Sequence, residues 1–248
     1  GGIGKTGWTA GLWAYGTAVE KTAAVREEWG SRVADSPAQL AEESDYLFLA
    51  VKPQNFEEAL ADLRDSVKKE TVIVSIAAGI TADYISAALG FAARVVLVMP
   101  NTPLLLGSGA SALSKSAAVP DEAFAYVRHI FDCAGITAVI PQEKMNEIIP
   151  INGSSPAFLY RYAQLFIEYG KSVGLEEEVC LRLFAQTMIG SARMMTESGY
   201  SLAELIQMVS SRGGTTIAGL EGLAEQGLPQ AVKSCCEKCV QRAKELAR

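Results

Sequence analysis

Hydrophobic residues in the first 140 positions form short continuous runs, separated by polar segments of helical length. The three clearest runs are residues 46–51, 71–76 and 94–99. A continuous apolar run of this length is typical of a strand that is buried on both faces of a parallel sheet. The alternation of such runs with helical segments predicts an α/β domain with a Rossmann-type parallel sheet.

The first 37 residues fit this pattern less well. Residues 21–29 are helix-like and 31–34 strand-like, and Ser36 followed by Pro37 predicts the start of a helix. Residues 2–7 fit the pattern G-x-G-x-x-G and are expected to open a helix through Trp13. No strand precedes these glycines, and none is predicted between residues 16 and 24. We therefore expect the sequence to lack the first and second strands of the sheet.

Candidate cofactor contacts follow the strands, because ligands of parallel α/β sheets bind at the carboxyl ends of the strands. The candidates are Gly2, Gly4, Lys5 and Thr6 in the glycine motif, Val51, Lys52 and Pro53 after the first run, Ala77, Ala78 and Gly79 after the second, and Asn101 after the third. Two of them have simpler explanations. Lys52 is equally consistent with a surface lysine, and Asn101 with an Asx turn between two prolines.

From residue 145 onward the pattern becomes helical. Apolar residues spaced three or four apart predict helices over 156–173, 176–196, 201–209, 217–226 and 230–247. The sequence therefore predicts a dinucleotide-binding domain over 1–143 and a helical domain over 144–248. Helices this apolar in about a hundred residues favour a homodimer formed through this half. The alternative is that they pack against the α/β domain of the same chain.

Ser210, Ser211, Arg212, Gly213, Gly214, Thr215 and Thr216 interrupt this helical half. A glycine pair costs helix stability and marks a break between helices. The backbone amides at the start of the following helix suit a small anion such as a carboxylate. The alternative is a plain turn between helices with a threonine as N-cap.

Composition excludes several classes of function. The net charge is −6 without a basic stripe, which argues against a nucleic-acid partner, and no run of about 18 apolar residues predicts a membrane span. Five scattered cysteines indicate a reduced, cytoplasmic protein. We expect no metal site, because Cys235, Cys236 and Cys239 share one predicted helix and His129 is the single histidine.

Seven motifs, in order, resemble the pyrroline-5-carboxylate reductase family over nearly the whole chain. They lie at residues 2–7, 50–54, 75–80, 99–103, 153–157, 185–187 and 213–220. The resemblance implies a Rossmann domain that binds NADPH or NADH and a helical domain that interlocks two subunits. The implied reaction is hydride transfer from the nicotinamide to the C=N carbon of 1-pyrroline-5-carboxylate, which gives proline in the last step of its biosynthesis.

The resemblance also implies roles in the glycine break. Thr216 is expected beside the ring nitrogen of the cyclic imino acid, as the catalytic residue. Ser211 and the backbone of Gly213, Gly214 and Thr215 are expected to hold the substrate carboxylate. Because a cyclic imine is protonated near neutral pH, Thr216 needs only to orient the nitrogen, and the protein positions the reactants and excludes water.

The chain departs from the family pattern at a few positions. Arg212 stands where the family usually has proline, Ser155 where it has glycine, and Leu97 where an arginine is common. These differences leave open a divergent paralogue that reduces another cyclic imino acid, or a non-catalytic cofactor-binding regulator. A hydroxyacid-type dehydrogenase is a further alternative, in which Lys171 is the nearest candidate for the acid–base residue.

Overall fold

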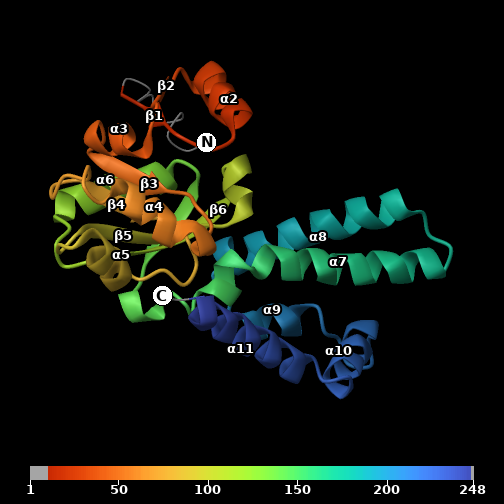
Figure 1. Ribbon diagram of the computed structural model, residues 1–248. Helices are drawn as coiled ribbons and strands as arrows, with labels where there is room; N and C mark the ends of the chain where they lie inside the picture. Colours follow the sequence, from red (N-terminus) through yellow and green to blue (C-terminus); the bar gives the residue numbers. More distant parts are fainter. Residues whose placement is uncertain (1–10, 247–248) are drawn as a thin grey trace. The chain divides into compact units, whose positions relative to one another are not determined.

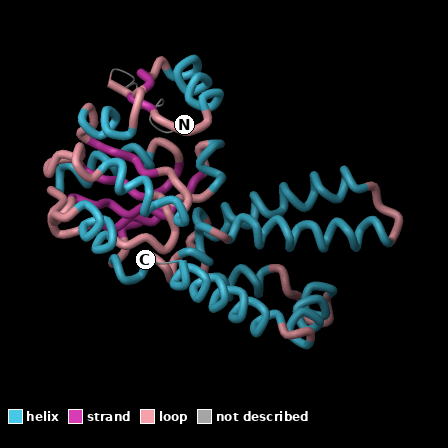
Figure 2. The backbone as a smooth tube through the Cα atoms, viewed as in Figure 1, coloured by secondary structure: helices cyan, strands magenta, loops and turns pink. Residues whose placement is uncertain are grey.

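The computed structural model describes residues 11–246, which form two compact units. The α/β unit contains the described residues up to 156 together with those from 238 onward, and the helical unit contains residues 157–237. Figures 1 and 2 show the sheet with its helices and the group of long helices. The expected domain boundary after residue 143 stays a prediction, because α7 and α11 both run across the division between the units.

The α/β unit alternates strands and helices as the hydrophobic runs predict. In chain order its elements are β1 (Trp13–Ala14), α2 (Val19–Trp29), β2 (Arg32–Val33), α3 (Pro37–Glu42), β3 (Tyr46–Leu49), α4 (Phe56–Leu63), β4 (Val72–Ser75), α5 (Ala82–Leu89), β5 (Arg94–Met99), β6 (Gly109–Lys115), α6 (Asp121–Asp132) and β7 (Gly135–Val139). The predicted start of α3 is confirmed, since the Ser36 hydroxyl accepts a hydrogen bond from the backbone amide of Gln39 at 3.1 Å.

Five strands form one sheet in the order β3-β4-β5-β6-β7. The predicted Rossmann-type sheet is confirmed, with one exception to its parallel pairing, because β5 and β6 are antiparallel. Only residues 100–108 connect these two strands, including the short helix η2 (Thr102–Leu106). A parallel connection needs a crossover of a dozen or more residues, so this link is too short for one.

A second, two-stranded sheet contradicts one expectation for the start of the chain. Trp13 lies in β1, which pairs in parallel with β2 through Trp13↔Arg32 and Ala14↔Val33. The prediction of a helix through Trp13 is therefore wrong, and a strand does precede α2. The signal was weak, because β1 has two residues and neither is β-branched. The glycine motif at residues 2–7 lies outside the described residues.

Successive side chains of the strands enter two separate cores on the two faces of the sheet. One core packs the strands against α4 and α5, and the other packs them against α6. The first includes Leu47, Leu49, Phe56, Leu60, Ile73, Ile85, Val95 and Leu97; the second includes Val72, Val74, Val96, Val98, Leu113, Val127 and Phe131. These two cores stabilise the α/β unit through buried apolar surface.

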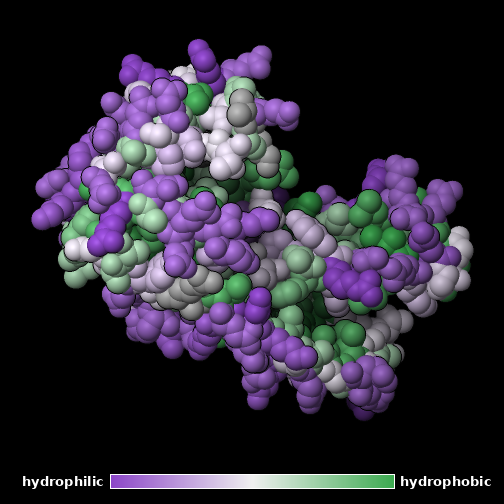
Figure 3. Space-filling model, viewed as in Figure 1, coloured by the Kyte–Doolittle hydropathy of each residue, from purple (hydrophilic) through white to green (hydrophobic). Residues whose placement is uncertain are grey.

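The helical unit is built differently. Its helices are α7 (Ser155–Ser172), α8 (Glu177–Glu197), α9 (Leu202–Met208), α10 (Thr215–Glu225) and α11 (Leu228–Leu246), which confirms the five predicted helices. No apolar side chain within residues 157–237 is buried, and Figure 3 shows hydrophobic side chains at its surface. None of the helices described in either unit is long and apolar enough to cross a membrane.

Candidate functional site

The carboxyl ends of β3, β4 and β5 bring three of the predicted segments to one edge of the sheet. The strands are parallel and in register, with Leu49 opposite Ser75 and Ser75 opposite Leu97. The segments after these strands are Val51–Pro53, Ala77–Gly79 and the loop that contains Asn101. These segments therefore lie at the edge where parallel sheets bind cofactors, and their contacts with a cofactor stay a prediction.

Lys52 occupies an extended position at the end of the β3 segment. Its backbone has φ −67° and ψ 148°, and Pro53 starts the short helix η1 (Pro53–Asn55). The amide of Asn55 donates to the carbonyl of Lys52 at 2.9 Å, which closes the turn. The exposed Lys52 ammonium has no ion-pair partner among residues 11–246, so its charge is available to an anionic ligand.

Asn101 holds the loop after β5 to the neighbouring strand. Its side-chain oxygen accepts a hydrogen bond from the amide of Ala110 in β6 at 2.9 Å. A cavity of about 480 Å³ adjoins this loop and is lined by Phe48, Ile76 and Asn101, among others. An Asx turn does not describe this contact, because the Asn101 side chain joins the loop after β5 to β6. Its role in cofactor binding stays a prediction.

Asn152 belongs to the same arrangement and was missed from the sequence. It lies in the π-helical turn η4 (Ile149–Gly153), where its side-chain nitrogen donates to the carbonyls of Met99 at 2.7 Å and Ala110 at 2.9 Å. Asn152 therefore ties the end of β5 to β6 beside the Asn101 loop. The available signal was a single amide side chain directly after the apolar residues 148–151.

The glycine motif at residues 2–7 precedes β1 in the chain. Gly2, Gly4, Lys5 and Thr6 lie outside the described residues, and their cofactor role stays a prediction. Only residues 8–12 separate Gly7 from β1, which is fewer than a crossover helix to a parallel strand requires. The spacing therefore argues against this motif as the turn of a β-α-β unit that ends in β1.

The glycine break in the helical unit forms a tight turn directly before α10. The amide of Gly214 donates to the carbonyl of Ser211 at 2.9 Å, and Gly213 has φ +71°. A positive φ at the third position is what a type II turn requires, and glycine provides it without strain. A Cβ on Gly214 would lie 2.6 Å from the Ser211 hydroxyl oxygen, so the second glycine is needed for close approach.

The start of α10 has no side-chain cap. Its N-cap residue is Gly214, not a threonine, so the expected alternative of an N-cap threonine is wrong. The first amides of the helix, from Thr215 to Ile217, consequently point out of the helix end without a capping oxygen. The hydroxyl oxygen of Ser210 is also buried without a hydrogen-bond partner among the described residues. The start of α10 and the Ser210 hydroxyl thus both carry polar groups without a described partner.

Lys171 does not resemble an acid–base residue. Its ammonium donates to a carboxylate oxygen of Glu177 at 2.5 Å. This hydrogen bond raises the pKa of Lys171 above its usual value, with a further contribution from the charge of Glu177. Lys171 is therefore held in an ion pair with Glu177 on the exposed surface.

The cysteines near the C-terminus also have an ordinary environment. Cys235, Cys236 and Cys239 are free thiols on α11, and the Cys239 sulfur donates to the Ser154 hydroxyl at 3.4 Å. Among the residues that the structure describes, no three His, Cys, Asp or Glu side chains gather in a geometry that could hold a metal ion.

Two family models match this chain, one in each half. Residues 142–246 match the family model for pyrroline-5-carboxylate reductase dimerisation, and residues 3–79 match the model for NADP oxidoreductases of the coenzyme F420-dependent type. The pyrroline-5-carboxylate reductase of Escherichia coli K12 is 33% identical over 237 residues, which cover 96% of this chain and 88% of that enzyme. The corresponding enzyme of Methanosarcina acetivorans is 33% identical over 88% of this chain and 81% of its own length.

Solved structures agree with these relatives. The 1-pyrroline-5-carboxylate reductase of Streptococcus pyogenes has a TM-score of 0.90 and 30% identity, covering 98% of this chain and 93% of its own. The pyrroline carboxylate reductase of Plasmodium falciparum, solved with NADP bound, has a TM-score of 0.87 and 25% identity, covering 99% and 96%. The chain belongs to the pyrroline-5-carboxylate reductase family.

Proposed function

We propose that the protein reduces 1-pyrroline-5-carboxylate to L-proline with NADPH or NADH, the last step of proline biosynthesis. The observation that carries this proposal is the uncapped start of α10, which follows the turn at Ser211–Gly214. Free amides at a helix N-terminus bind anions, and the substrate is a carboxylate. Family membership supports the same reaction independently.

Each residue of the turn has a distinct task in this proposal. The amides of Gly213 and Thr215 and the hydroxyl of Ser211 bind the carboxylate, and Gly214 holds the turn in shape through the hydrogen bond from its amide to the Ser211 carbonyl. The hydroxyl of Thr216, one residue further into α10, orients the imine nitrogen. Because the protonated imine is already electrophilic, these groups need only to position it, and a protein acid is unnecessary.

The α/β unit fits a nicotinamide cofactor, which supplies the hydride when it is bound. The residues that would hold it are Val51, Lys52 and Pro53, Ala77, Ala78 and Gly79, and Asn101, which share the carboxyl edge of the sheet. The side-chain nitrogen of Asn101 keeps its hydrogens for a ligand, since its oxygen is the atom bonded to Ala110. The Lys52 ammonium adds positive charge at this edge.

The active form is proposed to be a homodimer, or a larger assembly of dimers, in the cytoplasm. The helical unit buries no apolar side chain of its own, and a second copy with the same face would cover it. The hydroxyacid-dehydrogenase alternative is less favoured, because its acid–base candidate Lys171 is paired with Glu177. No nucleic acid or membrane partner is proposed.

The test is oxidation of NADPH and of NADH with racemic 1-pyrroline-5-carboxylate, measured for the wild type and for Thr216→Ala. We expect kcat/KM to fall about tenfold to a thousandfold in the variant, the size of effect that loss of one positioning donor produces. Thr196→Ala is the matched control, because its exposed hydroxyl bonds only to carbonyls within α8. Cofactor binding without turnover on any cyclic imine would instead support a regulator.

A further inference from the structure

The antiparallel ladder between β5 and β6 ends just before the Asn101 loop. Met99 is the last residue of β5 that pairs with β6, and Pro100 follows it without an amide hydrogen to donate. In a continued register, Asn101 would stand opposite Ala110. Hydrogen-bonded pairs alternate along such a ladder, and this pair would be one of them. Instead, the Asn101 carbonyl accepts from the Leu104 amide at 3.2 Å within η2, so the backbone groups of Ala110 need other partners.

Two asparagine side chains satisfy the backbone groups of Ala110. Its amide donates to the side-chain oxygen of Asn101 at 2.9 Å. Its carbonyl accepts from the side-chain nitrogen of Asn152 at 2.9 Å, and the same nitrogen donates to the Met99 carbonyl at 2.7 Å. Asn152 thus uses its amide nitrogen to hold the end of β5 against β6, at the point where the backbone ladder has stopped.

The turn that contains Asn152 is itself fixed against β5. A Cβ on Gly153 would lie 3.0 Å from the Met99 sulfur, so this turn packs closely on the end of the strand. The amide of Asn152 donates to the Ile148 carbonyl at 3.2 Å, and the Ser155 hydroxyl donates to the Asn152 carbonyl at 3.3 Å. The backbone of Asn152 is therefore held on both sides, which keeps its side chain at Ala110.

These bonds determine which atom of the Asn101 side chain is left for a ligand. Its oxygen is bonded to the Ala110 amide, and its nitrogen has no hydrogen-bond partner among residues 11–246. Asn101 and Gly153 both line the cavity of about 480 Å³ beside this loop. Thr102 supplies the other polar side chain of the wall, and the rest is apolar. A wall of this kind suits a flat ring with a substituent that accepts a hydrogen bond.

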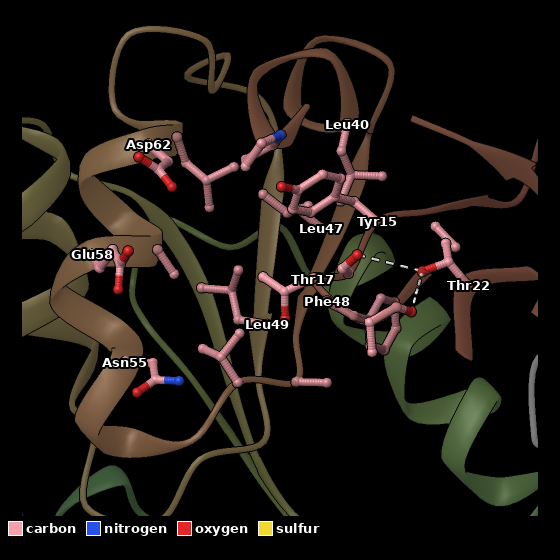
Figure 4. A pocket seen from close by; sticks show the side chains of 18 of the residues that line it. Tyr15, Thr17, Thr22, Leu40, Leu47, Phe48, Leu49, Asn55, Glu58 and Asp62 are labelled. Atoms are coloured by element: carbon pink, nitrogen blue, oxygen red, sulfur yellow. Dashed lines mark hydrogen bonds between the residues drawn. The ribbon is translucent and has the colours of Figure 1, made fainter. Parts of the chain in front are cut away.

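Another cavity of the α/β unit has a different charge. Figure 4 shows this space of about 490 Å³, bordered by Leu47 and Leu49 of β3 and by Glu58 and Asp62 of α4. Carboxylates in that position repel the phosphate groups of a dinucleotide. The described residues that line the Asn101 cavity include no charged side chain. Of the two spaces, the one beside Asn101 is therefore better suited to the uncharged, reduced nicotinamide.

We propose that Asn152 is a positioning residue for the nicotinamide end of the cofactor, and that it acts through Ala110 and Asn101. Asn152 holds Ala110 in place, and the Ala110 amide fixes the oxygen of Asn101. The Asn101 nitrogen is thereby oriented as a donor to the carboxamide oxygen of the nicotinamide. This inference rests on the proposed function, because it requires a bound nicotinamide cofactor. Without Asn152, the Asn101 amide loses its fixed orientation, and a donor that must first be ordered binds less tightly.

The test measures binding of NADPH, and of its fragment 2′-phosphoadenosine diphosphoribose, with no imine present. The fragment lacks the nicotinamide. For Asn152→Ala we expect the Kd of NADPH to rise about tenfold, the effect of one hydrogen bond, and the Kd of the fragment to stay unchanged. Asn101→Ala should give the same pattern. Because Asn152 acts through Asn101, the double variant should lose no more affinity than either single variant, whereas independent residues would lose about a hundredfold.

Ser116→Ala is the matched control, because it removes two comparable hydrogen bonds at the other end of β5. The Ser116 hydroxyl accepts from the Val95 amide and donates to the Ala93 carbonyl, both at 3.1 Å. The thermal unfolding midpoint should fall in this variant as in Asn152→Ala, while the affinity for NADPH stays at the wild-type value.

Two results would overturn the role of Asn152. One is an equal loss of affinity for NADPH and for the fragment in Asn152→Ala, and the other is a double variant whose losses are additive. A wild type that binds NADPH and reduces no imine would contradict the proposed reaction alone, since the affinities still decide the role of Asn152. A wild type that binds no NADPH would overturn both.

Discussion

The two units use their apolar side chains in opposite ways. In the α/β unit, Phe56, Leu60, Ile73 and Ile85 are completely buried between strands and helices. In the helical unit, Leu183 is 67% exposed and Tyr169 is 66% exposed. Burial of such side chains contributes about 1.5–3 kcal/mol each. One unit therefore has a buried core of its own, whereas the other leaves its large apolar side chains exposed.

Aromatic contacts in the helical unit illustrate the difference. Phe166 on α7 stacks on Phe184 of α8 with ring centroids 4.9 Å apart, yet Phe166 remains 43% exposed. Gly170 allows the two helices to approach, because a Cβ there would lie 2.5 Å from the Cys180 sulfur. α7 and α8 thus pack closely where they face each other, and their outer surfaces stay exposed.

The largest effect is expected from Gly135→Ala, which tests the self-sufficient core. Gly135 has φ +151°, and an added Cβ would lie 2.0 Å from the Gly109 carbonyl oxygen on β6. Backbone strain and overpacking together should cost about 3–5 kcal/mol of unfolding free energy. Urea denaturation checks this value.

The matched control is Gly190→Ala in α8, where an added Cβ meets no other atom within 4 Å. Alanine there should improve helix propensity by about 1 kcal/mol. If Gly190→Ala instead weakens association, then the open side of α8 is the surface that a partner covers. That result would sharpen the contrast between the units.

The next largest effect is expected from Leu183→Lys, which tests the incomplete surface. A lysine at a covered apolar position should weaken self-association by about 2–4 kcal/mol, the range of interface hot spots. Light scattering over a dilution series measures this change. Ile136→Lys is the control, because Ile136 is 72% exposed on β7 of the α/β unit and should leave the molar mass unchanged. Equal self-association of wild type and Leu183→Lys would contradict our view of the helical unit.

The contrast between buried and exposed apolar residues also explains which elements the sequence could predict. The buried strands β3, β4 and β5 were identified because their continuous apolar runs reflect a core within the chain. β6, with the sequence Gly-Ala-Ser-Ala-Leu-Ser-Lys, was not identified, because small residues there carry no periodic signal. β1 is too short to show a pattern. The contribution of Asn152 depends on contacts with Met99 and Ala110, 53 and 42 residues away, which local sequence does not encode.

In the candidate site, the turn at Ser211–Gly214 could be predicted from its glycines, whereas its capping could not. Two glycines after Ser-Arg mark the turn, but the choice of Gly214 over a threonine as N-cap follows from the backbone angles of the folded chain. The placement of Lys52 and Asn101 at one sheet edge followed from their position after strands. Their partners, Asn55 and Ala110, followed only from the structure.

A smaller effect is expected from Arg212→Pro in the helical unit. Arg212 is the second residue of the turn that ends with the Gly214 amide bonded to Ser211, and proline is favoured at this position. The substitution should stabilise the protein by about 0.4–1 kcal/mol, chiefly by restricting the unfolded chain. Thermal unfolding checks the gain. An unchanged KM for the imino acid would show that the Arg212 guanidinium does not bind its carboxylate, and a raised KM would show that it does.

The smallest effect concerns the ion pair that ties the end of α11 to the α/β unit. The Lys244 ammonium lies 3.0 Å from a carboxylate oxygen of Glu147, and this hydrogen bond lowers the pKa of Glu147 below its usual value. Because the folded state has the lower pKa, the stabilisation is complete above the usual pKa of glutamate. It is lost as the pH falls through the lowered value. Glu147→Gln should therefore cost less than about 1 kcal/mol at pH 7, as for exposed pairs, and nothing at the acid end. Chemical denaturation of wild type and variant between pH 7 and pH 3 measures the difference, and a gap between them that widens toward acid would contradict the assignment.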